Sequence, residues 1–388
     1  MAHGALPYLR VPTVFCAYRD SPQRRAALAA PRGAPERYLL FGLDQLVDRG
    51  WGASHGLEHE GRPPGWARAA GGAMKAGLER AGGYGGDFAT VLAALRRANR
   101  ADVVFSTVDT VGIPLMLLNR AGRVRPPLVY VAVGLPERLE RLGNDRMRRL
   151  YARALASSAA VVAYSEFEAD ELRSWMEAYG ASTRVEFVPF GVDEHAFAPA
   201  NVPPSVDVVS IGADPHRDVE LLVAVAAEMG GKTFRIVTTR DRARSLGALP
   251  PNVEVEVDLP FGEMRRRLEA ARAVALPVRE NSYSGATTVL LQALAAGKPV
   301  VVSRTKAIAT GYGLVDGESC RLVEPGDTAA FRRALGDVLR DEWHARALGA
   351  TARRTVEEGL TWTLYVDRLE AILRDACAAP RGARSANA

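Results

Sequence analysis

Short hydrophobic runs alternate with longer amphipathic stretches along almost the whole chain. The runs have the length and composition of strands, and the stretches carry apolar residues at helical spacing. Strands that alternate with helices in this way predict an α/β fold, in which parallel sheets are covered by helices on both faces.

The hydrophobic runs fall into two sets, each large enough for one doubly wound sheet. The first set is VPTVFCAY, ADVVFST, PLVYVAV, AAVVAYS and RVEFVPF. The second set is VDVVSIG, TFRIVTT, NVEVEVD, RAVALPV, PVVVS and SCRLV. Between them, GVDEHAFAPANVPPSVD contains Pro199, Pro203 and Pro204, which prevent a continuing helix and suit an exposed linker. We therefore place a domain boundary near residue 200.

Local capping signals predict several helix ends. Ser165 and Glu168 have the spacing of a capping box, which starts a helix over 166–178. Gly297 ends a helix that begins near Gly285, because glycine tolerates the left-handed stop and the proline that follows cannot continue the helix.

The segment from Ala53 to Gly86 is harder to assign. Its second part, PPGWARAAGGAMKAGLERAGGYGG, is rich in small residues and interrupted by glycines. It predicts a helix flanked by a mobile loop, for which two roles remain: a flexible lid or acceptor loop, or a variable surface connection.

Length and composition fit two globular domains, since the chain has 388 residues and domains are typically about 150 residues long. No stretch approaches the roughly 18 uninterrupted apolar residues of a membrane span, and MAHGALPYLRVPTVF lacks the pattern of a signal peptide. We expect a cytoplasmic protein. Cys16, Cys320 and Cys377 lie far apart without CxxC spacing, which predicts reduced thiols and neither a zinc cluster nor disulfides.

The charge distribution does not indicate nucleic acid as a partner. The net charge is only +5, and the basic residues do not alternate with aromatic ones. The densest basic run extends from Glu137 to Arg153 on an expected helix. Its ordinary interpretation is a solvated helix face. The alternative is a surface in weak contact with a membrane or an anionic acceptor.

The stretch from Leu276 to Ser303, LPVRENSYSGATTVLLQALAAGKPVVVS, combines a strand, a polar loop, a helix start and a second strand. At such a start the free backbone N–H groups and the positive helix end bind phosphate oxygens. Gln292, one turn beyond Thr288, is placed to reach a ribose. Alternatively, Ser284 only caps a buried helix and Gln292 binds nothing. The residues assigned to the site are Tyr283, Ser284, Gly285, Ala286, Thr287, Thr288, Val289 and Gln292.

Four segments in order resemble the retaining nucleotide-sugar glycosyltransferases of family 4, which have the GT-B fold. The stretch just described is one of them. FVPFGVDEHAF resembles the VPNGVD turn that ends the family's first domain, and VSIGADPHRDVELLVAVA resembles the opening strand and phosphate loop of its second domain. AGKPVVVSRTKAIATGYGLVDGESCRLVEPGDTAAF resembles the strand, helix and glycine run up to PGD. Together the segments cover most of residues 160–345.

The resemblance implies two Rossmann-like domains that face each other across a cleft. Residues 1–195 would bind the acceptor, residues 205–360 would bind the nucleotide sugar, and a last helix within 361–379 would return to the first domain. The implied reaction transfers a sugar from a nucleoside diphosphate to an acceptor hydroxyl with retention of configuration and without a metal or other cofactor. A small natural product, a lipid carrier and a glycan remain open as acceptors. A non-catalytic sugar-nucleotide-binding partner and a sugar-nucleotide epimerase remain as alternatives.

By resemblance, Ser284 and Gln292 stand where the family has the two glutamates of its E-x7-E motif. Glutamine keeps the ability to hydrogen-bond the ribose hydroxyls but lacks the charge. Since Ser284 brings no carboxylate to the reacting carbon, Glu280 in the same loop is the candidate substitute, with an exposed loop charge as the alternative.

The loop ADPHRD, which follows Gly212, stands where the family holds the diphosphate with an arginine and a lysine. Ala213 replaces the arginine, and Arg217 lies close to the lysine position. Arg217 is therefore the expected cation for the departing diphosphate. His216 is either a second contact or a surface position.

Polar residues also follow two other expected strands. Thr238 and Thr239 end TFRIVTT at an edge where open sheets bind ligands, so they are expected near the base, with a plain turn as the alternative. Asp109 follows ADVVFST in the same way. It is expected to contact an acceptor hydroxyl or to be the N-cap of the helix that contains residues 113–118. Arg217, Ser284, Glu280 and Asp109 are the candidate catalytic residues.

Overall fold

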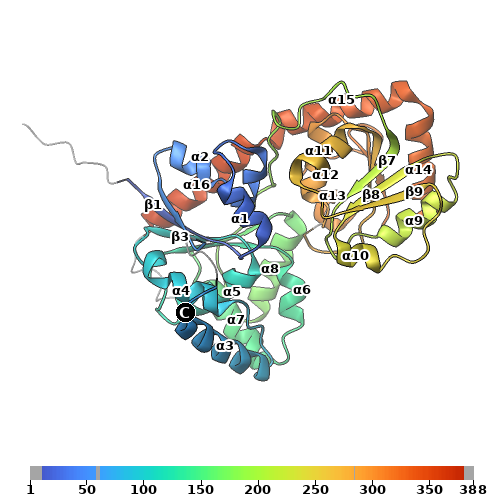
Figure 1. Cartoon of the computed structure of the whole chain (residues 1–388). Coiled ribbons are helices and arrows are strands. Elements are labelled where there is room, and N and C mark those ends of the chain that lie inside the picture. The colour runs from blue at the N-terminus through green and yellow to red at the C-terminus, as the bar shows by residue number, and fades with distance from the viewer. Residues whose placement is uncertain (1–10, 58–61, 284, 380–388) are drawn as a thin grey trace, which may run out of the picture. The chain divides into compact units, whose positions relative to one another are not determined.

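The computed structural model describes residues 11–57, 62–283 and 285–379. Within these ranges the chain forms two compact units (Figure 1). The first unit holds the described parts of Met1–Val162, Glu171–Glu186 and Arg368–Ala388, and the second holds those of Ala163–Asp170 and Phe187–Asp367. No helix among the described residues is both long enough and apolar enough to span a membrane.

The first unit is built on a six-stranded sheet with the order β2-β1-β3-β4-β5-β6. Its strands are β1 (Thr13–Ala17), β2 (Gly52–His55), β3 (Val103–Ser106), β4 (Leu128–Ala132), β5 (Ala160–Ala163) and β6 (Val185–Phe187). Its helices are α1 (Pro22–Ala29), the 3-10 helix Pro35–Leu40, α2 (Leu43–Asp48), α3 (Gly65–Arg80), α4 (Phe88–Ala98), α5 (Asp109–Arg120), α6 (Leu135–Glu140), α7 (Asp145–Ala156) and the part of α8 (Glu166–Ala178) from Glu171 onward. The pairings of β1 with β2 and β3, and of β3 with β4, are parallel.

The second unit has a second six-stranded sheet, in the order β12-β11-β10-β7-β8-β9, and every neighbouring pair in it is parallel. Its strands are β7 (Val206–Ile211), β8 (Phe234–Thr238), β9 (Val253–Val257), β10 (Ala271–Leu276), β11 (Val300–Ser303) and β12 (Arg321–Val323). Its helices are α9 (Val219–Ala227), α10 (Arg240–Arg244), α11 (Phe261–Glu269), α12 (Thr287–Ala295), α13 (Lys306–Ala309), α14 (Thr328–Arg340), α15 (Glu342–Gly359) and the start of α16 (Trp362–Ala378). The two sheets confirm the predicted doubly wound α/β fold.

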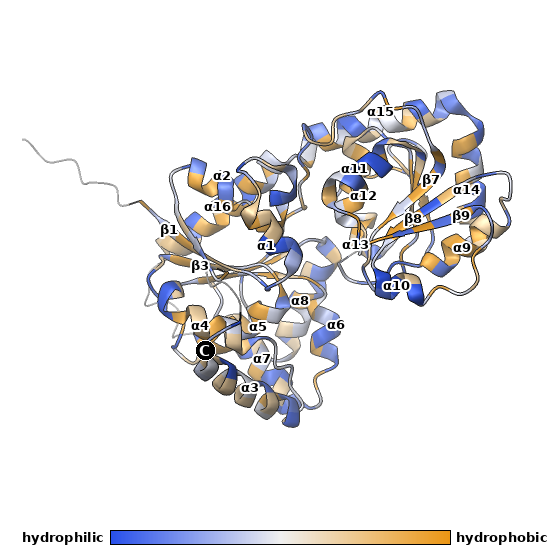
Figure 2. Ribbon diagram, viewed as in Figure 1, coloured by the Kyte–Doolittle hydropathy of each residue, from blue (hydrophilic) through white to orange (hydrophobic). Residues whose placement is uncertain are grey.

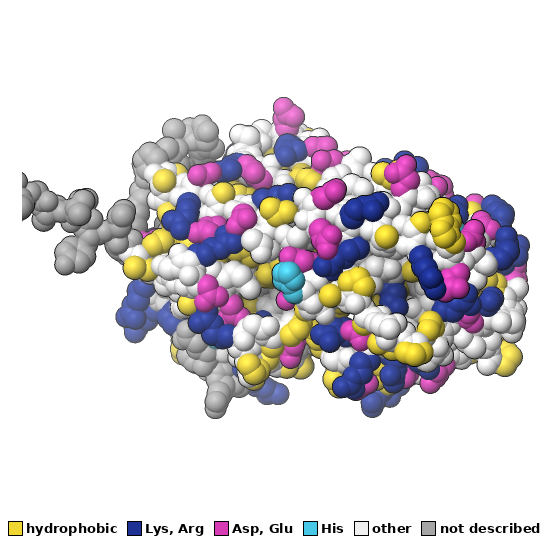
Figure 3. Space-filling view, turned by 90° about the horizontal axis from the view of Figure 1, so that it is seen from above, with side chains coloured by type: hydrophobic (Ala, Val, Ile, Leu, Met, Phe, Trp, Pro, Cys, Tyr) yellow, Lys and Arg dark blue, Asp and Glu magenta, His cyan; other side chains and the backbone are white. Residues whose placement is uncertain are grey.

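Each unit has its own apolar core between the sheet and the helices. In the second unit Val208, Phe234 and Ala273 of the sheet pack with Leu222 of α9 and Phe331 of α14, and all five are almost fully buried. Figure 2 shows apolar residues along the strands and polar ones on the outer faces of helices such as α10 and α14. On the face drawn in Figure 3, basic and acidic side chains are interspersed, in keeping with the small net charge.

The strand order of each sheet reverses next to its first strand. In the second unit β8 and β9 lie on one side of β7, and β10, β11 and β12 lie on the other. In the first unit β2 lies on one side of β1 and β3 on the other. Open parallel sheets bind ligands at such a reversal, outside the carboxyl ends of the strands, because the connecting loops separate there. The loops after β7 and β10 and those after β1 and β3 are therefore the expected ligand-binding places.

Most predicted elements occur where the hydrophobic pattern placed them. The capping box is confirmed at its first bond, since Ser165 Oγ accepts a hydrogen bond of 2.9 Å from the Glu168 N–H and α8 begins at Glu166. The strand β2 was not predicted, because its sequence GASH contains no apolar run.

The helix expected between Ala53 and Gly86 is confirmed, whereas the loop that follows it differs from the expected mobile segment. The stretch GWARAAGGAMKAGLER is one continuous helix, α3, despite its glycines. Gly71 lets α3 approach α4 closely, because a methyl group there would lie 2.5 Å from the Ala89 nitrogen. The loop after α3 is held in place, since the Tyr84 N–H and carbonyl both bond to the Tyr151 hydroxyl, at 2.9 and 2.6 Å. Residues 58–61 lie outside the described residues.

The basic run from Glu137 to Arg153 does not form the single helix that was expected. It is divided between α6 and α7. Asn144 starts the second helix by accepting a hydrogen bond of 3.0 Å from the Met147 N–H. An N-cap of this kind starts a new helix, which the count of arginines did not reveal.

The last helix, α16, begins one residue after the expected Thr361, and its second half belongs to the first unit. There Glu370 accepts hydrogen bonds from Arg49 Nη1 at 2.8 Å and from Trp51 Nε1 at 2.9 Å. Partial burial acts to raise the pKa of Glu370, but the bonds from Arg49, Trp51 and Arg374 outweigh it and lower the pKa to about 2. The expected linker around residue 200 lies within the second unit.

Candidate active site

The loops after β7 and β10 join at the strand-order reversal of the second unit. Arg217 and Val278 form an isolated β-bridge between the two loops. The Arg279 N–H donates to the His216 carbonyl at 2.8 Å, and the Asp218 N–H donates to the Pro277 carbonyl at 2.9 Å. These bonds fix one loop against the other.

Asp214 is the centre of a small polar cluster in these loops. Its Oδ1 accepts from the His216 N–H at 2.8 Å, and its Oδ2 accepts from the Tyr283 hydroxyl at 2.9 Å. The same hydroxyl lies 3.1 Å from His216 Nδ1, and the two rings meet edge to face at 5.6 Å. Asp214, which the sequence analysis did not select, thereby joins His216 and Tyr283, which it did.

The Asp214 carboxylate lies directly against Gly285, just before α12. A methyl group at Gly285 would overlap its oxygen and lie 3.0 Å from its Cβ. The N-cap of α12 is Ala286, which has no side-chain acceptor for the first N–H groups of the helix. The predicted helix start near Gly285 is thus two residues too early, and Ser284 lies outside the described residues. The Asp214 carboxylate therefore lies near the start of α12, where the free N–H groups of a helix can bind an anion from solution.

Arg217 lies beneath this loop and not in solvent. Its side chain is 2% exposed and donates to the Ile211 carbonyl at 2.7 Å and to Ser210 Oγ at 2.8 Å. Burial lowers the pKa of its guanidinium to about 10, although the Asp214 charge acts in the opposite direction. Gly212 has φ +144°, and a methyl group there would lie 2.6 Å from Arg217 Nη1. Direct contact of Arg217 with a diphosphate stays a prediction.

The other predicted site residues of this unit differ in the hydrogen bonds that their side chains make. Thr238 ends β8, and its buried hydroxyl has no hydrogen-bond partner among the described residues. Thr239 caps α10 by accepting a hydrogen bond of 3.4 Å from the Arg242 N–H. This local role corresponds to the alternative of a plain turn. Glu280 is exposed and accepts from the Lys306 N–H at 3.0 Å, so it caps α13.

The first turns of α12 are partly open to a ligand. Thr287 is buried, whereas Thr288 and Val289 are half-buried. Gln292 is also half-buried, and its amide makes no hydrogen bond with the residues that the structure describes.

Asp109 is 3% exposed in the first unit, at the carboxyl end of β3. It accepts hydrogen bonds from the Tyr130 hydroxyl at 2.5 Å, Arg138 Nε at 3.0 Å and the Val133 N–H at 3.4 Å. Burial raises its pKa, against the effect of these bonds. The N-cap alternative is wrong, because Val108 is the N-cap and Asp109 is the first residue of α5. Nothing in the sequence distinguished Arg138 from the other arginines of the basic run between Glu137 and Arg153.

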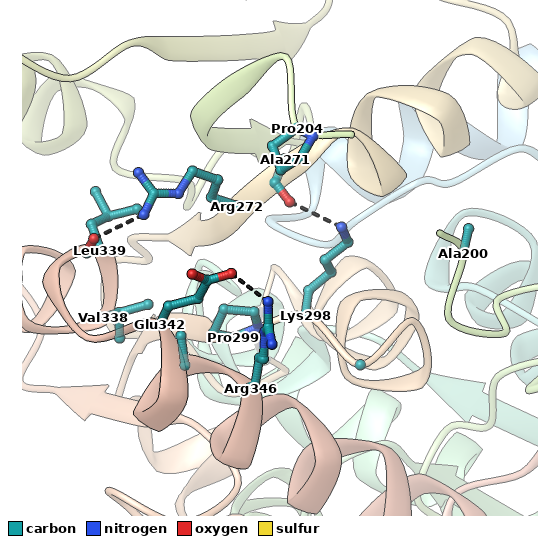
Figure 4. A pocket seen from close by; sticks show the side chains of 12 residues that line it. Ala200, Pro204, Ala271, Arg272, Lys298, Pro299, Val338, Leu339, Glu342 and Arg346 are labelled. Atoms are coloured by element: carbon teal, nitrogen blue, oxygen red, sulfur yellow. Dashed lines mark hydrogen bonds and ion pairs between the residues drawn. The ribbon is translucent and has the colours of Figure 1, made fainter. Parts of the chain in front are cut away.

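A cavity of about 310 Å³ opens at the opposite edge of the second sheet (Figure 4). It is lined by residues at the amino ends of β10 and β11, including Arg272 and Lys298. Lys298 Nζ donates to the Ala271 carbonyl at 2.9 Å, and Arg272 donates to the Leu339 carbonyl at 3.0 Å. Arg346 pairs with Glu342. The basic groups are thus occupied by the protein's own acceptors, and the cavity is separate from the site at the strand carboxyl ends.

Metal ligands and thiols are the remaining groups of chemical interest within 11–57, 62–283 and 285–379. No cluster of three or more His, Cys, Asp or Glu side chains suits a metal ion there. Cys16, Cys320 and Cys377 are free, as predicted. Burial raises the pKa of Cys16 to about 12, although a hydrogen bond with Tyr18 acts against it, so this thiol is not activated.

Both halves of the chain match known families. Residues 57–196 match the model of glycosyltransferase family 4, and residues 206–341 match that of glycosyl transferases group 1. The chain is 29% identical over 163 residues to an MMP α-(1→4)-mannosyltransferase of Mycolicibacterium hassiacum, a match that covers 42% of this chain and 37% of that protein. It is 26% identical over 224 residues to a GDP-mannose-dependent α-(1-6)-phosphatidylinositol monomannoside mannosyltransferase of Mycolicibacterium smegmatis, covering 50% and 58%. The chain thus spans only part of the length of these relatives.

Solved structures show the same fold over nearly the whole chain. Sucrose-phosphate synthase from Thermosynechococcus elongatus superposes with a TM-score of 0.70 at 17% identity, covering 95% of this chain and all of that one. Anabaena HepE in complex with UDP-glucose superposes with a TM-score of 0.66 at 14% identity, covering 93% and 99%. The two family matches together cover most of the chain and identify it as a glycosyltransferase of the family 4 and group 1 type. The solved structures show that it has the GT-B fold.

Proposed function

We propose that this glycosyltransferase transfers a hexose from a nucleoside diphosphate to an acceptor hydroxyl with retention of configuration. The observation that carries the proposal is the strand-order reversal beside β7, where Gly285 and the start of α12 lie next to the loop over Arg217. A diphosphate needs the positive end of a helix and a nearby cation, and this place provides both. Two relatives are named for GDP-mannose and HepE was solved with UDP-glucose, so these are the first donors to test.

The proposed role of the chain is to orient the donor and to stabilise the departing diphosphate. Negative charge accumulates on that group as the glycosidic bond breaks, and fixed dipoles and charges stabilise it without reorganisation. The α12 dipole and the buried Arg217 act in this way, and Gln292 holds the ribose. In the front-face reaction that we propose, an oxygen of the leaving phosphate takes the acceptor proton, so no metal or other cofactor takes part.

Nucleoside diphosphate binding tests the donor site. We expect GDP or UDP to bind in calorimetry and to raise the melting temperature. Gln292→Ala is expected to weaken this binding by about 1 to 2 kcal/mol, the scale of a lost hydrogen bond. Gln45→Ala, another half-buried helical glutamine but in α2, is the matched control. Equal affinities for all three proteins would remove Gln292 from the site.

Turnover by the purified chain tests the reaction. We expect donor-dependent glycoside formation in which the product keeps the anomeric configuration of the donor, measured by NMR coupling constants. An epimer formed from the donor alone would support the epimerase alternative. Nucleotide binding without turnover would support the non-catalytic partner.

Asp214 is expected to oppose nucleotide binding, because its carboxylate lies where the diphosphate would approach Gly285. Asp214→Asn keeps one oxygen that accepts from the His216 N–H and presents an amide N–H to the Tyr283 hydroxyl oxygen, which then accepts instead of donating; the negative charge is removed. We expect it to tighten GDP or UDP binding about tenfold, since like charges a few ångströms apart repel by about 1 to 4 kcal/mol. The affinity for the uncharged nucleoside should not change. Weaker diphosphate binding would instead make Asp214 a donor contact.

A further inference from the structure

Arg138 is held in one orientation by two separate parts of the first unit. Its Nε donates to Asp109 Oδ2 at 3.0 Å, and Asp109 is itself bound by the Tyr130 hydroxyl. The guanidinium carbon lies 4.2 Å from the centre of the Tyr84 ring. A hydrogen bond at Nε and an aromatic face together fix the plane of the guanidinium.

The glycine-rich loop GGYGG places Tyr84 in this position. Both backbone groups of Tyr84 bond to the Tyr151 hydroxyl. Gly86 has φ +62°, and a methyl group there would lie 2.8 Å from the Thr110 carbonyl oxygen and from the Pro114 ring. The loop therefore passes α5 at a distance that only glycine permits, and the Tyr84 ring lies over Arg138 as a result.

The two terminal amino groups of Arg138 are unused by the part of the chain that the structure describes. Its only hydrogen bond there is made by Nε, and its side chain is 35% exposed. Arg37 in the same unit provides an internal comparison. That guanidinium makes a two-point pair with Asp44 and donates to the carbonyls of Ala27 and Ala30 at 2.8 Å. An arginine with a structural role thus uses its whole donor set, whereas Arg138 keeps a rigid fork available.

The fork lies at the ligand-binding edge of the first sheet. Asp109 follows β3, and Arg138 lies in α6, which follows β4. Arg141, three residues further along, is exposed and has no partner among the described residues, so it adds positive charge to the same region. A pre-oriented guanidinium fork matches two oxygens of a phosphate or carboxylate group.

We propose that Arg138 binds an oxyanion, a phosphate or a carboxylate group, on the acceptor. This rests on the proposed function and on the family resemblance, by which residues 1–195 would bind the acceptor. Asp109 and Tyr84 position the guanidinium, and its two terminal amino groups donate to two oxygens of the ligand. The acceptor is thus an anionic molecule, and its charged group sets its orientation.

Calorimetric or NMR titration of the full chain with inorganic phosphate and with acetate tests this proposal and separates the two kinds of oxyanion. The donor site is first saturated with GDP or UDP, so that phosphate at α12 does not contribute. We expect Arg138→Gln to weaken binding of the preferred anion at least tenfold and Arg141→Gln to weaken it less than threefold. GDP and UDP should bind equally well to all three proteins.

Arg138→Gln leaves the buried Asp109 without its cation, so the double variant Arg138→Gln with Asp109→Asn is the second arm. It removes both charges together, and we expect the same loss of anion binding in a protein that melts cooperatively. Wild-type affinity for phosphate and acetate in either folded variant would overturn the proposal. If no nucleoside diphosphate binds to the chain, the titration is run without one. The missing diphosphate binding then counts against the proposed donor site, whereas anion binding that depends on Arg138 still supports the proposal for Arg138.

Discussion

Replacing Arg217 by methionine is expected to leave the second unit about as stable as before and to weaken nucleoside diphosphate binding about tenfold. Burial lowers the pKa of Arg217 to about 10, which corresponds to a cost of about 3 kcal/mol for keeping the charge inside the protein. The bonds to Ile211 and Ser210 contribute about 1.5 to 3 kcal/mol each, so at the lower end of that range they offset the cost of burial. Because the Arg217 charge adds little to the stability of the fold, we expect it to act in diphosphate binding, through its electric field at the start of α12.

Chemical denaturation and calorimetry check this prediction together. Arg244→Met, an exposed position on α10, is the control and should change neither quantity. The burial cost of Arg217 is present below its folded pKa and disappears as the group loses its proton above about pH 10. As the pH rises above about 10, the free energy of unfolding of the wild type should therefore increase relative to that of Arg217→Met. Unchanged diphosphate affinity in a folded Arg217→Met variant would exclude Arg217 from the donor site.

Gly349→Ala is expected to destabilise the second unit by about 2 to 3 kcal/mol. Gly349 lies in α15 against Gly297, just after α12, and a methyl group there would overlap the Gly297 carbonyl oxygen. That oxygen belongs to the backbone, so relief requires one helix to move, and overpacking of this kind costs about 1 to 3 kcal/mol. Because the proposed donor site lies at the start of α12, we also expect weaker GDP or UDP binding.

The matched control is Gly336→Ala in α14, where the nearest atom to an added methyl group is 3.7 Å away, at the end of the Arg340 side chain. It should stabilise the protein by about 0.5 to 1 kcal/mol, because alanine loses less entropy in a helix. Urea denaturation of the three proteins measures both effects. A Gly349→Ala variant as stable as the wild type would show that α12 and α15 separate without cost.

The elements that carry the proposed donor site could be predicted from the sequence, because their signals are local. A buried strand, a polar loop with Gly285 and an amphipathic helix follow one another within one stretch, and each leaves its own pattern. The role of Arg217 was less accessible. Its place in the loop was predicted correctly, but the direction of its side chain depends on Ser210 and the Ile211 carbonyl at the end of β7.

The first unit was predicted less completely, since its polar cluster joins distant segments. Asp109 and Arg138 are 29 residues apart, and the Tyr84 ring comes from a loop that precedes both. Composition indicated a mobile segment there, whereas the contacts of Tyr151 and Gly86 hold it still. A contact between side chains from such distant segments leaves no periodic pattern in the sequence.

The sequence by itself determined the strands other than β2, most of the helices between them and the polar turn between β10 and α12, because hydrophobic spacing and capping act over a few residues. Only the tertiary structure decided that Asp214 faces Gly285, that Arg217 is buried and that Arg138 keeps a free fork. Those outcomes depend on which side chains meet across neighbouring loops, and that is set by strand order and close helix packing rather than by local pattern.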